Sequence, residues 1–188
     1  MATIISALTP AVPGAAYEAG PAADQPTVIV PRAEFSATCL ALRDLPGLRF
    51  DLLADVTAVD WWPAEPRFEV IYHLASTELS QRLRLKVRLA GEDAHAPTAR
   101  GVWLSANWLE REVWDLFGVV FDGHGDLRRL LMPEDWEGHP LRKDYPVQIK
   151  MKPNVYTPLQ MTGQEFRDKI VADREVRGGT GEERRGRE

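Results

Sequence analysis

The chain has very little cysteine, and this limits the chemistry that it can carry alone. Its 188 residues include one cysteine, Cys39, which we place at a buried position of the first helix of the domain. An iron-sulfur cluster normally takes four thiolates and a disulfide takes two. We therefore expect no cofactor in this chain.

Nucleotide-binding loops and long apolar runs are also lacking. The glycine-rich run at 178–181 lies in a polar tail with no strand before it, so it does not predict a nucleotide site. No stretch approaches the roughly 18 to 20 apolar residues that cross a bilayer. Any membrane contact is therefore expected to be made through partners. The net charge of -5 argues against a nucleic-acid binder.

Basic residues are missing from the start of the chain. Residues 1–25 contain no Lys or Arg and are rich in Ala, Pro and Gly. This composition lacks the positive region of a secretory signal and the arginines of a transit peptide. We predict a flexible leader over 1–25.

After residue 25 the sequence predicts a strand followed by a helix. Residues 27–30 form a short apolar strand, and Pro31 is a favourable first residue for a helix. In that helix Phe35, Cys39 and Leu42 recur at helical spacing and share one face. The helix is expected to end around Asp44, before Pro46 and Gly47.

Further strands are predicted at 48–59, 68–74, 82–89 and, as a short addition, 102–104. The strand at 82–89 has the clearest pattern, because apolar and basic residues alternate along it. Together these elements predict an α+β fold over 26–121, with a small mixed or antiparallel sheet and packed helices. An extended C-terminal arm is expected to follow the domain.

Two features of these strands have alternative interpretations. The basic row Arg82, Arg84, Lys86 and Arg88 is either a strip that binds a partner or the solvent-exposed face of a sheet. The adjacent Trp61 and Trp62 either stack on a ligand or, as the favoured interpretation, cover the core at a strand end.

A capped helix is predicted from residue 107. Asn107 is a good N-cap, Glu110 completes a capping box, and Gly118 ends the helix. Its apolar face consists of Leu109, Val113, Leu116 and Phe117. Arg111 and Asp115 are spaced for a weak pair. With Glu110, Glu112 and Asp115 the helix is acidic, and we expect it to meet something basic.

The segment 122–160 fits no helix or strand pattern, because glycine and proline interrupt a run of charged, aromatic and branched residues. A long irregular segment is usually functional or disordered, and its apolar content argues against disorder. We predict an extended arm that docks on a partner. A short helix around 164–174 and a disordered tail are expected within 161–188.

These residues resemble the C subunit of the proton-pumping NADH-quinone oxidoreductase, respiratory complex I. About forty dense positions carry the resemblance: Glu110-Arg111-Glu112, Trp114-Asp115-Leu116-Phe117-Gly118, Gly123-His124, Asp126-Leu127-Arg128-Arg129-Leu130-Leu131 and Asp135 through Pro146. One departure is Gly125, where the family usually has proline.

The resemblance implies a non-catalytic subunit of the peripheral arm, on the cytoplasmic side of the bacterial membrane. FMN and iron-sulfur clusters would be held by partner subunits, and the D and B subunits would be the main contacts. The expected interface residues are Glu110, Arg111, Glu112, Asp115, Arg128, Arg129, Leu130, Leu131, Trp136, Arg142, Lys143 and Tyr145. The arginines and Lys143 would meet carboxylates of the partner.

Other functions remain open at this point. His124 and His139 lie near carboxylates, but their spacing matches no compact metal motif, and structural hydrogen bonding is favoured. The acidic helix is favoured as an interface over an acid/base set. A related hydrogenase or a dehydrogenase with another electron donor would have an equivalent subunit, and a stand-alone metal-dependent enzyme is a further alternative.

Overall fold

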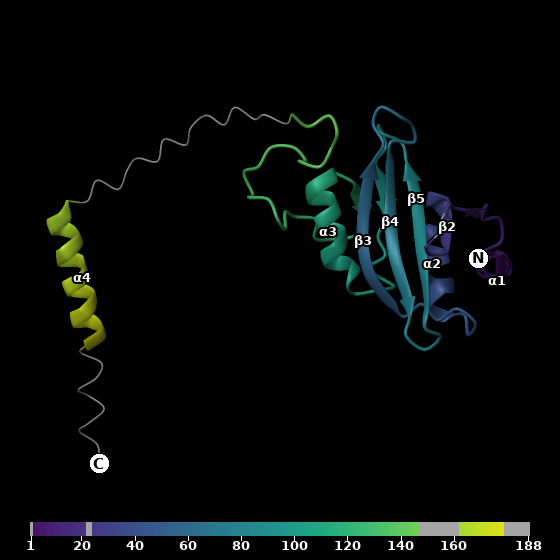
Figure 1. Ribbon diagram of the computed structural model, residues 1–188, viewed down its shortest axis with the longest axis horizontal. Coiled ribbons are helices and arrows are strands. Elements are labelled where there is room, and N and C mark those ends of the chain that lie inside the picture. Colours follow the sequence, from purple (N-terminus) through teal and green to yellow (C-terminus); the bar gives the residue numbers. More distant parts are fainter. Residues whose placement is uncertain (1, 22–23, 147–161, 179–188) are drawn as a thin grey trace, which may run out of the picture. The chain divides into compact units, whose positions relative to one another are not determined.

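The structure is a computed structural model that describes residues 2–21, 24–146 and 162–178. The chain divides into two compact units, Met1–Pro146 and Val147–Glu188. Figure 1 shows the elements of both units. None of the described helices is long and apolar enough to cross a membrane.

The described elements of the first unit are short helices and one main group of strands. In chain order they are α1 (Ala2–Ala11), β1 (Glu18–Ala19), β2 (Thr27–Ile29), η1 (Arg32–Glu34), α2 (Phe35–Asp44), β3 (Leu52–Asp60), β4 (Phe68–Ser76), β5 (Gln81–Leu89), β6 (His95–Pro97), α3 (Ala106–Phe117) and β7 (Val120–Asp122).

The main sheet has five strands in the order β1-β2-β5-β4-β3. Strands β3, β4 and β5 form an antiparallel meander, whereas β2 pairs with β5 in parallel. Strands β6 and β7 form a separate parallel pair. The expected α+β fold with a mixed sheet is therefore confirmed.

The core lies between the sheet and the helices. Alternate residues of β4 and β5 point into it, as the period of two predicts. Helix α2 presents Phe35, Cys39 and Leu42 to this face, and the ring of Phe35 lies 4.8 Å from that of Tyr72. The predicted strand-helix unit and the buried cysteine are confirmed.

The start of the chain differs from the predicted flexible leader. It forms α1, whose Ile4 and Leu8 are buried in the core together with Val12 just beyond the helix. Strand β1 then pairs with β2 at the sheet edge. Ile4, Leu8 and Val12 are spaced at i, i+4 and i+8, which is the spacing of one helix face. This pattern was overlooked because the composition of the segment suggested a flexible leader.

Helix α3 packs along β3 (Figure 1). The predicted strand at 102–104 is wrong: these residues form turns, and Trp103 points inward, where its Nε1 donates to the carbonyl of Phe50 over 3.0 Å. The Ser105 hydroxyl donates to the Leu53 carbonyl of β3 over 3.1 Å. These bonds attach the start of α3 to the edge strand.

The tryptophans at the β3–β4 turn do not cover the core. Trp61 and Trp62 remain 54% and 53% exposed. The end of the core is covered by Arg67 and Arg142, whose guanidinium carbons lie 4.8 Å and 5.2 Å from the ring centroid of Phe68. The apolar stems of these two arginines therefore cover the core where Trp61 and Trp62 were predicted to cover it.

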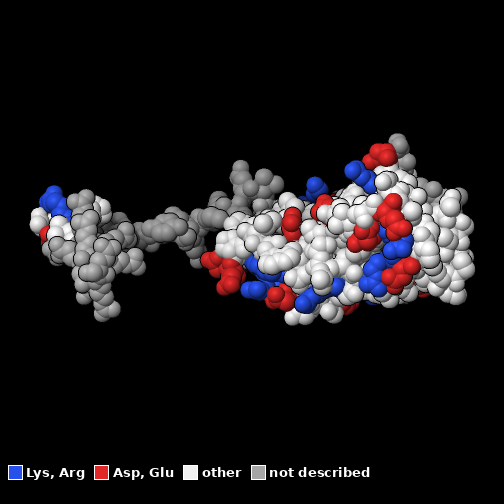
Figure 2. Space-filling view, turned by 90° about the horizontal axis from the view of Figure 1, so that it is seen from below, with Lys and Arg blue, Asp and Glu red and all other residues white. Residues whose placement is uncertain are grey.

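The basic row of β5 is largely paired within the chain. Arg84 bonds Asp24 at 3.0 Å, and Lys86 bonds Glu69 at 2.6 Å. On the face of the domain seen in Figure 2, basic and acidic side chains are interspersed. Because Arg84 and Lys86 are paired and only 21% and 15% exposed, little of the row is free to bind an acidic partner.

The second unit contains one described helix, α4 (Gly163–Gly178), where the sequence predicted a helix around 164–174. Thr162 and Glu165 exchange hydrogen bonds at its start, as in a capping box. The rest of the predicted arm, 147–160, lies outside the described residues, as do residue 161 and residues 179–188 of the predicted tail.

Candidate functional site

The described part of the predicted arm, residues 122–146, folds back on its own domain. It runs beside α3 and reaches the β3–β4 turn, at one end of the sheet (Figure 1). Buried carboxylates attach it at two places, Asp115 on α3 and Asp60 at the end of β3. From this point on, "the arm" means residues 122–146.

Asp115 binds the first part of the arm. Its side chain is fully buried, and Oδ2 accepts the backbone N–H groups of Leu130, Leu131 and Met132 over 3.0, 2.8 and 2.9 Å. Burial alone would raise the pKa of Asp115, but these N–H groups and the Arg129 guanidinium lower the pKa below its usual value. The carboxylate therefore stays charged and holds the arm.

The neighbouring arginines also bond within the chain. Arg129 donates to Asp115 Oδ1 over 2.7 Å and to the carbonyls of Trp136 and Gly138. Arg111 donates to the carbonyls of Arg128 and Arg129 over 3.2 and 3.1 Å, so the predicted Arg111–Asp115 pair does not form. These two arginines, expected to meet a partner, are therefore bonded within the chain and hold the arm.

Asp60 and Arg67 bind the end of the arm. Arg67 donates from Nε and Nη2 to both Asp60 oxygens, over 2.9 and 2.8 Å, and from Nη1 to Asp144 over 3.0 Å. Asp60 also accepts the N–H of Lys143 over 2.8 Å. Burial raises the pKa of Asp60, but these donors outweigh it and lower the pKa to about 2. Two strands and the arm thus share one ion-pair network.

Glu110 is a third buried carboxyl group, in the second turn of α3. It accepts the Thr98 hydroxyl over 2.5 Å and the Ala99 N–H over 2.6 Å. Burial raises its pKa to about 7, against the smaller opposing effect of these bonds. Glu110 therefore attaches the 98–100 loop to α3, and the predicted capping box with Asn107 is wrong, because the N-cap is Ser105.

The raised pKa of Glu110 predicts a specific pH dependence. Because the folded state binds the proton more tightly, the stabilisation is complete below pH 4.5 and is lost as the pH rises to about 7. The unfolding free energy should fall by about 3 kcal/mol across this window from this group. In Glu110→Gln, urea unfolding at pH 5, 6, 7 and 8 should show that this component has disappeared.

The matched control for this experiment is Glu112→Gln on the same helix, where the pH dependence should remain. Parallel pH profiles for the wild-type chain and Glu110→Gln would contradict the assignment of this titration to Glu110. The comparison uses differences between variants, so that the contributions of all other ionisable groups cancel.

Both histidines of the arm make structural hydrogen bonds. His124 Nε2 lies 3.0 Å from the Asn107 carbonyl, while Nδ1 lies 3.3 Å from the Asp126 N–H, which fits a neutral ring with Nε2 protonated. Burial lowers the pKa of His124, in keeping with this form. His139 Nδ1 lies 3.0 Å from the Asp115 carbonyl.

Two glycines set the path of the chain around these histidines. Gly118 ends α3 with φ +75°, as predicted, and a Cβ there would lie 2.5 Å from the His139 ring. Gly125 has φ +80°, which proline cannot adopt because its ring holds φ near -65°. The turn at this position therefore requires the glycine.

The predicted interface residues divide into two groups. Glu110, Arg111, Asp115 and Arg129 are buried or nearly so and bond within the chain. By contrast, Arg128, Leu131 and Lys143 are exposed, while Glu112, Leu130, Trp136, Arg142 and Tyr145 are half-buried. Trp136 stacks on Tyr145 with ring centroids 6.5 Å apart. The interface role of all twelve remains a prediction.

The structural roles of Asp60, Arg67 and Thr98 were not predicted from the sequence. A signal for Asp60 was present, because it continues the inward-facing series of Val56 and Ala58 along β3. A charged residue at a core-facing position is normally paired. Thr98 carried no comparable signal, since its position was assigned to no element.

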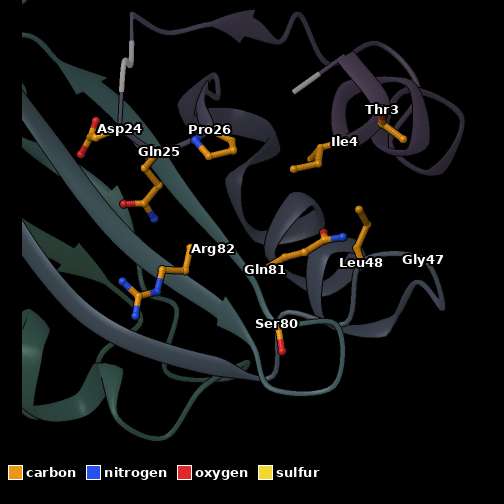
Figure 3. A pocket seen from close by; sticks show the side chains of 10 residues that line it. All are labelled: Thr3, Ile4, Asp24, Gln25, Pro26, Gly47, Leu48, Ser80, Gln81 and Arg82. Carbon is orange, nitrogen blue, oxygen red and sulfur yellow. The ribbon is translucent and has the colours of Figure 1, made fainter.

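No grouping of three His, Cys, Asp or Glu side chains in 2–21, 24–146 and 162–178 is arranged to hold a metal ion. A cavity of about 720 Å³ lies between the start of α1, the α2–β3 connection and the β4–β5 turn. In Figure 3 it is lined by Asp24, Gln25 and Arg82, together with Thr3, Ile4, Pro26, Gly47, Leu48, Ser80 and Gln81. None of the predicted site residues lines it.

The fold and the site define an α+β domain whose C-terminal arm is bound to the domain by buried ion pairs. The chain belongs to the family described as "Respiratory-chain NADH dehydrogenase, 30 Kd subunit", which matches residues 28–150. The family resemblance seen in the sequence is thereby confirmed. That description names a subunit of the respiratory-chain NADH dehydrogenase.

Two curated relatives illustrate the match. The C 2 subunit of NADH-quinone oxidoreductase from Rhizobium meliloti (strain 1021) is 50% identical over 119 residues, which cover 63% of this chain and 65% of the relative. The C subunit of the same enzyme from Roseiflexus sp. (strain RS-1) is 43% identical over 146 residues, covering 78% and 84%. The chain thus spans just under two thirds of the first relative and more of the second.

Solved structures share the fold. A trypsin-resistant fragment (1-134) of Nqo5 is 32% identical with a TM-score of 0.53, covering 67% of this chain and 97% of the fragment. A chain of the membrane-bound sulfane sulfur reductase, an archaeal respiratory membrane complex, is 27% identical with a TM-score of 0.63, covering 78% and 85%. Relatives of this fold therefore occur in more than one respiratory complex.

Proposed function

We propose that this chain is a structural subunit of the peripheral arm of a proton-translocating NADH-quinone oxidoreductase, and that it carries no catalytic residue. The proposal is supported mainly by one observation: charged residues that carry the family resemblance form structural bonds within the chain. Asp115 and Arg129 hold the arm in place, with no exposed acid/base pair formed between them. The chemistry of such a complex, from NADH through FMN and iron-sulfur clusters to quinone, would take place on other subunits.

The contribution to electron transfer would be geometric. A rigid domain with a folded arm can hold neighbouring subunits at fixed distances, and this requires buried attachments rather than reactive groups. By family resemblance, the neighbours would be chiefly the D and B subunits. The chain would lie on the cytoplasmic side of the membrane and contact the membrane only through the complex.

A second candidate is supported by the likeness to the sulfane sulfur reductase chain, which has the higher TM-score of the two solved structures. In this candidate the chain has the same structural role in a hydrogenase or in a dehydrogenase with another electron donor. The fold and the arm are compatible with both candidates, because the donor is bound by a different subunit.

The experiment is affinity purification of the chain, tagged at its C-terminus, from gently solubilised membranes of its native host. The expected result is recovery of a complete set of NADH-quinone oxidoreductase subunits with inhibitor-sensitive NADH-dependent quinone reduction. A hydrogenase or another dehydrogenase set would favour the second candidate. Recovery of the chain alone would contradict both.

A further inference from the structure

Large apolar side chains remain exposed at the end of the domain where the arm lies. Four of them form what we call the apolar rim: Trp61, Trp62, Leu131 and Leu141, which are 54%, 53%, 59% and 48% exposed. Clustered exposed residues of this kind mark interaction sites more often than single ones do. Whether these four side chains form one interaction site therefore depends on how close together the backbone places them.

Hydrogen bonds place the two leucines at the C-terminal end of α3. The N–H of Leu131 binds Asp115 over 2.8 Å, and the N–H of Leu141 binds the carbonyl of Leu116 over 3.0 Å. Asp115 and Leu116 are consecutive. The arm therefore leaves this end of the helix and returns to it, and both leucines lie there.

The tryptophans lie next to the following residues of the arm. Asp60 accepts the N–H of Trp62 over 3.0 Å and, through its other oxygen, the N–H of Lys143 over 2.8 Å. Lys143 is two residues after Leu141. In Figure 1 the arm and the β3–β4 turn lie at the same end of the domain. The four apolar side chains thus border one end of the domain.

The backbone beneath the rim is held in place before any partner binds. Asp115 and Asp60 have fully buried side chains, and each accepts several hydrogen bonds from the arm or from the β3–β4 turn. A surface that is already ordered loses less conformational entropy on association. Tryptophan is also enriched among the residues that contribute most to binding. These properties suit a protein interface.

The charge beside the rim is mainly acidic. Glu134, Asp135 and Glu137 lie between the two leucines, are exposed, and form no ion pair with any residue that the structure describes. Of the arm's arginines, Arg129 is bound to the buried Asp115, whereas Arg128 pairs with Asp126 at 3.1 Å and stays 69% exposed. Lys143 is exposed at the far end. Exposed acidic residues thus outnumber exposed basic ones beside the rim, whereas the sequence suggested a mainly basic surface.

We infer that the apolar rim and its acidic turn, residues 134–137, dock on a neighbouring protein subunit that presents an apolar depression bordered by Lys and Arg. The inference rests on the proposed function, because it names the surface used for assembly. Charge complementarity selects a basic border, and the rigid indoles would be the anchors. The buried Arg129 does not meet a carboxylate of the partner.

Two variants test the inference in the full chain, tagged and expressed in its native host. The first is Trp62→Ser with Leu141→Ser, and the second is Glu134→Lys with Glu137→Lys. We expect each to lower the amount of co-purified subunits by at least about tenfold. Because all four side chains are exposed or partly exposed, the melting temperature of the purified chain should stay near that of the wild type.

Matched controls lie away from the rim. Leu52→Ser with Leu79→Ser removes two exposed apolar side chains at the start of β3 and in the β4–β5 turn, and Asp44→Lys with Glu78→Lys reverses two exposed charges at the end of α2 and in the β4–β5 turn. Both controls should co-purify with subunits at the wild-type level. Equal losses in the control and the rim variants would overturn the inference.

The outcomes separate the inference from the function on which it rests. Wild-type assembly of the Trp62→Ser, Leu141→Ser variant would overturn the docking surface while the proposed function stands. Wild-type assembly of the charge-reversed variant would overturn the basic border of the partner. Failure of the unmodified chain to co-purify with any subunit would instead overturn the proposed function.

Discussion

Replacing Asp115 by alanine should lower the unfolding free energy by about 3 to 5 kcal/mol, since it leaves the mostly buried Arg129 without its partner. The same change leaves the N–H groups of Leu130, Leu131 and Met132 without an acceptor. For a domain of this size the melting temperature should fall by roughly 6 to 20 °C. Urea denaturation and a thermal melt of the purified chain measure both quantities.

The control for this prediction is Glu112→Gln, three residues earlier on the same helix. Its carboxylate accepts no hydrogen bond from the described residues, so the change should stay within about 0.5 kcal/mol. A melting temperature of Asp115→Ala equal to that of this control would show that the arm is not attached through Asp115.

Replacing Arg67 by alanine should have an effect of similar size, about 3 to 5 kcal/mol, because the buried Asp60 then has no compensating charge. In the wild-type chain, Asp60 has a folded pKa of about 2, below its ordinary 3.8. Its stabilising contribution is therefore present above pH 3.8 and is lost as the pH falls through about 2.

In the variant the sign of this pH dependence should reverse. Burial without the guanidinium raises the pKa of Asp60, so protonation now favours the folded state and the deficit against wild type should shrink as the pH falls. Urea unfolding at pH 3, 4, 5 and 7 measures this. A deficit that is constant over this range would count against the buried pair.

A double variant distinguishes the loss of the ion pair from a general loss of packing. Asp60→Asn with Arg67→Met removes both charges and should cost less than Arg67→Ala alone, because no buried charge is left unpaired. The exposed Arg88→Ala should cost at most about 1 kcal/mol. A double variant less stable than the single one would contradict this account.

The sequence predicted those features that depend on short-range periodicity. The alternation in β4 and β5, the helical spacing in α2 and the stop at Gly118 each follow from local geometry, and each is confirmed. Predictions that required knowledge of a distant neighbour were less successful. The N-cap at Asn107 was wrong because Glu110 bonds the 98–100 loop instead of the helix start.

For the candidate site, too, local features were predicted correctly and contacts between distant residues were not. The dense charged run identified the family, because about forty positions carry that resemblance. The run did not indicate which of its charges are accessible. Asp115 could pair with Arg111 on its own helix, with Arg129 on the arm or with a partner, and sequence spacing favoured the first. The structure has the second.

The amino-acid sequence alone was enough to establish the family and the periodic elements α2, β3, β4, β5 and α3. The folded structure was needed to show that the arm packs onto its own domain, that Trp61 and Trp62 stay exposed, and that the accessible charge on the arm is mainly acidic. Periodicity reflects which side of an element is buried, a local property. The pairing of a buried charge is decided by residues far apart in the chain, which meet only when it folds.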